Sequence, residues 1–127
     1  MIKNILCKRF AVWLLFLCFL GSCANQIKFD KNKWQPNGET EQPPYYRREM
    51  LNDLLTNYKL VGKQYANIIS LLGIPSFKDS CNFGYNVIVD YGSDIDPIYT
   101  KTLDFVFSKD SIIISCKVNE WRKNNRL

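Results

Sequence analysis

The hydrophobic and polar positions of this chain follow a helical rhythm first and an extended rhythm later. Across residues 44–58 and again across 63–72, apolar side chains recur at the spacing of one helical face. Gly73 and Pro75 then stop the second helix, because glycine readily takes a positive φ and proline lacks the amide donor. We therefore expect two short helices that form a helical hairpin. The first helix is expected to bury Met50, Leu51, Leu54, Leu55 and Tyr58 and to expose Arg47.

Beyond residue 80 the apolar positions alternate with period two, as in strands that bury one face. A turn at Lys109 and Asp110 sets inward residues against inward residues across the last two strands. It pairs Phe107 with Ile112, Phe105 with Ile114 and Leu103 with Cys116. We expect strands at 83–91, 102–107 and 112–118. Residues 44–127 are thus predicted to form an α+β domain, with a two-helix hairpin packed on a three-stranded antiparallel β-meander.

The outer face of this predicted sheet carries a candidate docking patch. The register makes Val106 and Ile113 cross-strand partners there, and Ile88 is expected nearby. Three aliphatic side chains on a solvent face can mark a binding surface. Alternatively, Phe29 or Trp34 covers them from the segment that precedes the domain.

The first 22 residues have the pattern of a targeting segment. Lys3, Lys8 and Arg9 precede an uncharged apolar run of 11 residues at 10–20. This run is too short to span a bilayer, which takes roughly 20 residues, but it fits the apolar core of a secretory signal peptide. We interpret residues 1–22 as a signal peptide.

The end of this segment points to lipidation. The string Leu20-Gly21-Ser22-Cys23 is similar to the lipobox of bacterial lipoproteins, with an aliphatic residue, two small residues and a cysteine. The thiol is the available nucleophile, and small neighbours let the processing enzyme approach the backbone. We expect cleavage before Cys23, with lipid attached to that cysteine. The alternative is an uncleaved signal anchor in which the cysteine is incidental.

Residues 23–43 comprise this cysteine and a polar stretch without helical or strand period. We interpret the stretch as a flexible tether, which at this length has a reach of roughly 25 Å. Phe29 and Trp34 are exceptions in it, and they are expected either to dock on the domain or to enter the membrane interface.

The composition of the chain mainly argues against certain functions and bonds. Three of the 17 basic residues lie in the signal peptide, so the mature chain carries 14 basic and 12 acidic residues, a net charge of +2. This balance does not favour nucleic-acid binding. Of the five cysteines, Cys81 and Cys116 remain free to pair. The predicted meander separates them by two strand spacings, which argues against a disulfide.

The amino-acid types also argue against an enzyme. The chain has no histidine, so it lacks the commonest general base and metal ligand. Asp94 and Asp96 lie in a glycine-bounded loop typical of turn chemistry. Ser80, Cys81 and Ser93 have no histidine to activate them. We expect neither catalysis nor a metal or cofactor.

The order of elements behind a lipid-bearing cysteine resembles the SmpA/OmlA (BamE-like) small lipoproteins. In that family a glycine opens the second helix, an aliphatic residue follows six positions later, and Leu-Leu-Gly-x-Pro closes it. Gly62, Ile68 and the string Leu71-Leu-Gly-Ile-Pro75 match here, and Leu103–Phe107 matches a Leu-x-Phe-x-Phe strand. Gln64 departs from the serine or threonine that usually caps this helix. The resemblance covers about residues 45–120.

This resemblance implies a non-enzymatic role in the cell envelope. It implies an outer-membrane assembly accessory or scaffold that contacts barrel-assembly proteins or anionic lipid. A two-helix, β-sheet architecture also occurs in β-lactamase-inhibitor-like modules, so a periplasmic inhibitor or immunity-type lipoprotein is the alternative. The expected partners are the membrane, through the lipid on Cys23, and an envelope protein. Ala24 follows the cysteine, which in enteric-type sorting favours the outer membrane, with the domain facing the periplasm.

Overall fold

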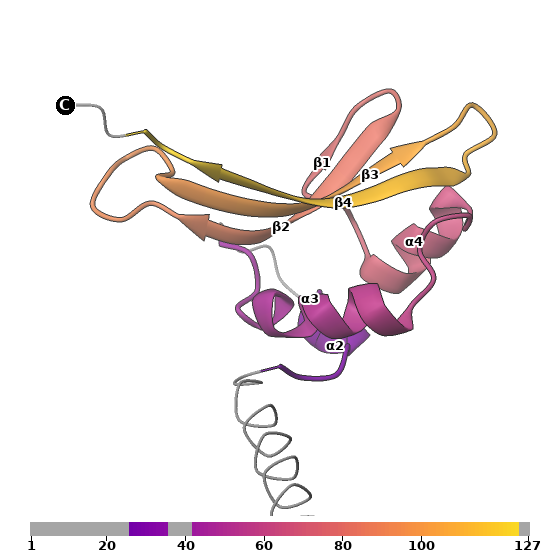
Figure 1. The fold of residues 1–127 in the computed structure, drawn as a ribbon, viewed down its shortest axis with the longest axis horizontal. Helices are drawn as coiled ribbons and strands as arrows, with labels where there is room; N and C mark the ends of the chain where they lie inside the picture. Colours follow the sequence, from indigo (N-terminus) through magenta and orange to yellow (C-terminus); the bar gives the residue numbers. More distant parts are fainter. Residues whose placement is uncertain (1–25, 36–41, 125–127) are drawn as a thin grey trace, which may run out of the picture.

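A computed structural model describes residues 26–35 and 42–124 (Figure 1). The predicted signal peptide, its flank Leu20-Gly21-Ser22 and the predicted lipid site Cys23 lie outside the described residues. Short helices come first and strands follow. The elements are α2 (Lys31–Trp34), α3 (Tyr46–Asn57), α4 (Tyr65–Leu72), β1 (Phe77–Lys78), β2 (Asn82–Asp90), β3 (Tyr99–Phe107) and β4 (Ile113–Arg122).

The described residues form an α+β fold in which a helical layer covers one face of an antiparallel sheet (Figure 1). The strands lie in the order β1-β2-β3-β4. The predicted fold class is therefore confirmed, but its details differ. The sheet has four strands where three were predicted. The additional strand, β1, has only two residues, which are too few to show a period in the sequence. Among the described residues the helical layer has three helices where a two-helix hairpin was predicted. The additional helix, α2, packs against both α3 and α4.

The core lies between the helices and the sheet. Large side chains fill it, and several aromatic rings meet there, with Phe83 stacked on Phe105 at 4.9 Å between ring centroids. The buried hydrophobic residues are Trp34, Met50, Leu51, Leu54, Leu60, Ile68, Leu72, Phe83, Tyr85, Val87, Leu103, Phe105 and Ile113.

The buried face of α3 is rotated from its predicted position. Leu55 and Tyr58 were expected in the core but are 40% and 38% exposed, whereas Arg47 was expected in solvent and is only 6% exposed. The cause is α2, which the sequence pattern does not reveal. Its Trp34 lies against Arg47 and shifts the contact toward that side of the helix.

The ends of α4 follow the expected chemistry. Gln64 occupies the N-cap position and its side chain makes no capping hydrogen bond, as the poor capping propensity of glutamine predicts. Gly73 ends the helix with φ 81°, a conformation that costs other residues energy.

The register of β3 and β4 differs from the prediction by a β-bulge. Phe107 faces Ile113, but Val106 faces Ser115, so Ile114 is the extra residue. The predicted pairs of Phe107 with Ile112, Phe105 with Ile114 and Leu103 with Cys116 are therefore wrong. The actual partners of Phe105 and Leu103 are Cys116 and Val118. The bulge keeps the later residues on their predicted face while moving Ile113 to the core.

The sheet extends beyond the helices as an arm (Figure 1). It comprises the ends of β2 and β4, the start of β3 and the β2–β3 loop. Polar contacts stabilise it: Lys101 pairs with Glu120 at 3.4 Å, and Lys123 pairs with Asp94 at 2.7 Å.

Candidate functional site

The most informative site is the segment that follows the predicted lipid site. Residues 26–35, called the docked segment here, lie against α3 instead of forming a free tether. The Ile27 amide donates to the Glu49 carbonyl at 3.2 Å. The Phe29 amide donates to Asp53 Oδ2 at 2.8 Å. The tether prediction is therefore wrong for these residues, and the alternative that Trp34 docks on the domain is confirmed. Residues 36–41 lie outside the described part.

Apolar burial explains why this segment docks. Trp34 is fully buried and contacts Tyr85, with 6.1 Å between ring centroids. Phe29 lies 5.9 Å from the Trp34 ring and 5.2 Å from the Tyr58 ring. Burying a side chain of this size stabilises by roughly 1.5–3 kcal/mol. Asp30 starts α2 by accepting the Asn32 amide at 2.9 Å.

A buried cation joins the docked segment to the sheet. Arg47 Nε donates to the Trp34 carbonyl at 2.8 Å, and its Nη1 donates to the Asn86 carbonyl at 2.8 Å. The guanidinium also lies over the rings of Trp34 and Tyr85, at 5.2 and 5.8 Å from their centroids. Burial lowers the pKa of Arg47 to about 10, which leaves it charged at neutral pH. One side chain thus holds three elements together.

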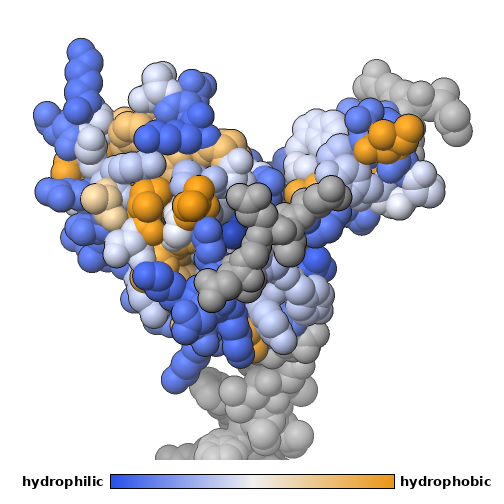
Figure 2. Space-filling model, turned by 180° about the vertical axis from the view of Figure 1, so that it is seen from behind, coloured by the Kyte–Doolittle hydropathy of each residue, from blue (hydrophilic) through white to orange (hydrophobic). Residues whose placement is uncertain are grey.

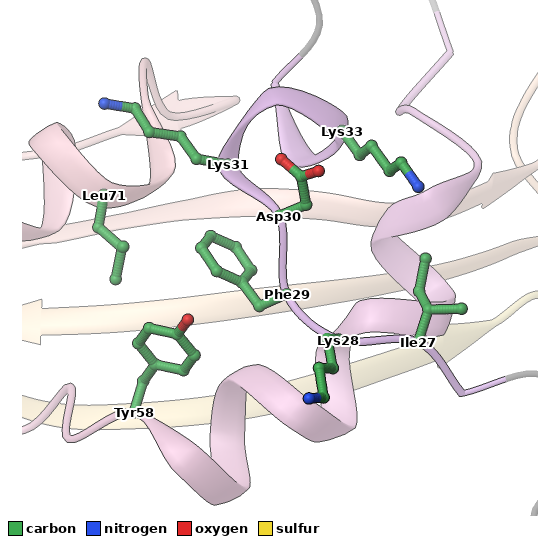
Figure 3. A pocket seen from close by; sticks show the side chains of 8 residues that line it. All are labelled: Ile27, Lys28, Phe29, Asp30, Lys31, Lys33, Tyr58 and Leu71. Atoms are coloured by element: carbon green, nitrogen blue, oxygen red, sulfur yellow. The ribbon is translucent and has the colours of Figure 1, made fainter.

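A surface hollow of about 640 Å³ opens beside the docked segment (Figure 3). Phe29, Tyr58 and Leu71 point toward one another and form its apolar part, and the side chains of three lysines extend around it (Figure 3). The lining residues are Ile27, Lys28, Phe29, Asp30, Lys31, Lys33, Tyr58 and Leu71. A partly apolar hollow with a cationic rim suits an amphiphilic or anionic surface better than a small polar substrate.

The charges around this hollow are mostly positive and accessible. Lys28, Lys31 and Lys33 are exposed, and Asp30 is the one acidic residue of the lining. The nearby Asp53 is used internally: the Phe29 amide and the Asn57 side chain donate to it and lower its pKa. Lys33 lies over the exposed Tyr46 ring at 5.2 Å.

The predicted docking patch does not exist as one surface. Ile113 is 1% exposed and belongs to the core, and Ile88 packs against the core. Val106 alone stays on the outer face, opposite Ser115 and Asn82. Two bulges are responsible, one at Ile114 and one at Val87, because an extra residue changes which side chains face inward.

The candidate catalytic residues are not brought together as a site. Asp94 accepts from Lys123 Nζ and from the Ile95 amide, and these bonds lower its pKa. Ser80 and Cys81 lie in the β1–β2 turn, at the other end of β2. In the described part of the chain, no three His, Cys, Asp or Glu side chains form a group that could hold a metal ion.

The remaining cysteines are both free thiols. Cys81 is exposed and Cys116 is half-buried on β4. The Cys81 carbonyl accepts from Phe107 of β3, whose other side pairs with β4, so β3 lies between the two cysteines as predicted. Burial, with a smaller effect of Asp104, raises the pKa of the Cys116 thiol to about 11.

The apolar surface is concentrated on the lobe that contains the helices, whereas the arm is mostly hydrophilic with one apolar spot (Figure 2). Within residues 26–35 and 42–124, no helix is long and apolar enough to cross a membrane. Comparison of the chain with protein-family models, curated proteins and solved structures found no match.

Proposed function

We propose that this protein is a lipid-anchored, non-enzymatic binding module of the bacterial envelope, held with its helical layer against the membrane. The observation that carries the proposal is the docked segment. Gln26 is the first described residue, and its side chain accepts from Asn52 Nδ2 at 3.0 Å. Gln26 lies three positions after Cys23, which limits the distance between the two α-carbons to about 11 Å. A lipid on Cys23 would therefore keep α2 and α3 near the headgroups.

The lysines of the docked segment support this orientation. Lys28, Lys31 and Lys33 lie 5–10 positions after Cys23 and are exposed. Near an anionic leaflet each basic residue contributes about 1 kcal/mol of attraction. The apolar hollow between them gives acyl chains or headgroups a surface to contact. Anchor and surface contact would then act together, as stable membrane association requires two signals unless several chains are attached.

With the helices toward the membrane, the sheet is left for a protein partner. Figure 1 shows the sheet and its arm on the opposite side of the molecule from α2. An assembly accessory needs such an arrangement, because its partner must approach from the aqueous side.

Replacing Cys23 with Ala tests the anchor. The variant should lose the lipid mass and accumulate as uncleaved precursor or leave the membrane fraction. Unchanged fractionation with unchanged mass would overturn the proposal. Crosslinking of the intact lipoprotein tests the partner: barrel-assembly components support the accessory role, whereas a single secreted enzyme or toxin would replace it with an inhibitor role.

A further inference from the structure

We infer that the exposed edge of β4 is a docking site for an extended segment of a partner protein, which adds to the sheet as a fifth strand. β4 comprises ten residues, Ile113–Arg122, and among the described strands its one neighbour is β3. An edge strand carries unpaired backbone groups that can accept another strand. Natural proteins usually blunt long edges with proline, bulges or a covering element.

The two edges of this sheet differ in how far their backbone groups are already hydrogen-bonded. On the β2 side, β1 pairs with Phe83 and Gly84. Beyond it, the Asn86 amide donates to Ser76 Oγ at 2.9 Å, and its carbonyl accepts from Arg47. The backbone groups of this edge are therefore already paired at Asn86, beyond the residues that the short strand β1 covers.

On the β4 side only the first residues are covered. The Gly62 amide donates to the Ile113 carbonyl at 2.8 Å, and the Ile113 amide donates to the Lys63 carbonyl at 2.8 Å. Gln64 also bridges to Ile112 in antiparallel fashion. The chain thus already adds a short antiparallel segment to this edge, and the bulge at Ile114 ends that pairing. In Figure 1, α4 lies near only the beginning of β4.

The backbone hydrogen bonds at the two ends of β4 determine which backbone groups remain open. Ile113 directs its amide and carbonyl outward, whereas the Lys123 amide donates inward to the Ile98 carbonyl at 2.8 Å. Residues of a strand alternate in this direction. Counting back from Lys123, the amides and carbonyls that face the open edge belong to Cys116, Val118, Glu120 and Arg122.

The side chains beside this edge indicate which residue types a partner strand would carry. Lys117 and Trp121 lie on the outer face, and Trp121 is 52% exposed. Lys117 forms no ion pair with any described residue, and its cross-strand neighbour Asp104 accepts from Asn119. Val118 packs against the core on the inner face. A matching strand would place an acidic residue beside Lys117, an aliphatic residue beside Val118 and an aromatic residue beside Trp121.

A second copy of this chain fits the edge less well. Two β4 strands related by a twofold axis pair residues on the same face. Lys117 and Glu120 lie on opposite faces, so they can never pair in such a dimer. The charge of Lys117 would stay unmatched, which favours a different chain as the occupant.

The test uses the mature protein in detergent micelles and the peptide Thr-Phe-Lys-Thr-Val-Glu-Val-Thr, which runs antiparallel to residues 115–122. Binding should slow hydrogen exchange at the amides of Val118 and Glu120. The amides of Lys117 and Asn119, already bonded to β3, should change little. Equal changes at both sets, or changes confined to the helical hollow, would overturn the inference.

Two controls separate backbone pairing from nonspecific contact. Glu120→Pro removes one outward amide at an edge position where proline is tolerated, and it should weaken binding about tenfold. Glu120→Gln keeps the amide and should bind as the parent does. If Glu120→Pro fails to fold, the peptide with its edge-facing amides methylated replaces it, and undiminished binding of that peptide to the parent protein would overturn the inference.

This inference rests on the proposed binding role and names its partner as an extended acidic–aliphatic strand. The peptide reports on the edge whether or not Cys23 carries lipid, and membrane fractionation reports on the anchor alone, so the two claims fail separately. A dimer that forms without peptide and disappears in Glu120→Pro would show that a second copy is the occupant and would also overturn the inference.

Discussion

At the residue scale, Arg47 connects the segment next to the predicted anchor with the rest of the domain. Its guanidinium bonds to two carbonyls from different elements and lies between two aromatic rings. Because no described carboxylate pairs with this buried group, these contacts must replace its hydration. A methionine in its place would keep much of the volume but leave both carbonyls without this donor.

We expect Arg47→Met to lower the free energy of unfolding by about 2–4 kcal/mol. Arg48→Met is the matched control, because Arg48 is exposed and contacts only the exposed Tyr45 ring among the interactions of the described residues. Its effect should stay within about 0.5 kcal/mol. Urea unfolding measures both, and equal effects would show that Arg47 does not join the elements as described.

The two free cysteines are expected to differ in reactivity. Cys81 is exposed, whereas burial raises the pKa of Cys116 to about 11. At pH 8 roughly one Cys116 thiol in a thousand is ionised, so iodoacetamide should modify Cys81 first. Modification of Cys116 should accelerate as the pH rises toward 11, because the thiolate is the nucleophile. Peptide mass mapping measures both rates, and rapid modification of Cys116 at pH 8 would contradict its burial.

At the element scale, the β-bulge in β4 determines which of two adjacent isoleucines supports the core. We expect Ile113→Ala to lower the free energy of unfolding by about 2–4 kcal/mol. Ile114→Ala should change it by no more than about 0.5 kcal/mol, since Ile114 is 58% exposed. Denaturant unfolding distinguishes them. A larger loss of unfolding free energy in Ile114→Ala than in Ile113→Ala would contradict the bulge and support the register without it.

The elements that the sequence predicts are those with a sustained period. The two longer helices and the three long strands show their period over many residues, and each lies close to its predicted range. The missing parts are short or irregular: β1 has two residues, α2 has one turn, and the bulges interrupt the alternation. Trp34 was a usable signal for α2, because so large an apolar residue rarely occurs in a free tether.

The docked segment is expected to contribute strongly to stability. Trp34→Ala should lower the free energy of unfolding by about 3–5 kcal/mol and expose residues 26–35 to protease. Trp34→Phe keeps most of the apolar contact and removes a buried indole N–H that has no hydrogen-bond partner among the described residues. That variant should stay within about 1.5 kcal/mol of the parent. Equal protease resistance of Trp34→Ala and the parent would show that the segment does not depend on this residue.

At the scale of the whole molecule, the docked segment would turn the proposed lipid anchor into a fixed orientation. A free tether of twenty residues would let the domain turn in any direction, whereas a docked segment that begins three positions after Cys23 would fix the face nearest the membrane. In the proposed orientation the helical layer with its lysines would lie toward the headgroups. The sheet, its arm and the open edge of β4 would lie toward the aqueous side, where a partner could reach them.

The most direct test of this account measures the distance of two positions from the membrane surface. One dye is attached at Lys28→Cys in a Cys81→Ser background, and the other is attached at the native Cys81, in the β1–β2 turn that points away from the helices (Figure 1). With the mature lipoprotein in vesicles that carry a headgroup quencher, we expect strong quenching at position 28 and weak quenching at position 81. Equal quenching at both positions, or stronger quenching at position 81, would contradict the account.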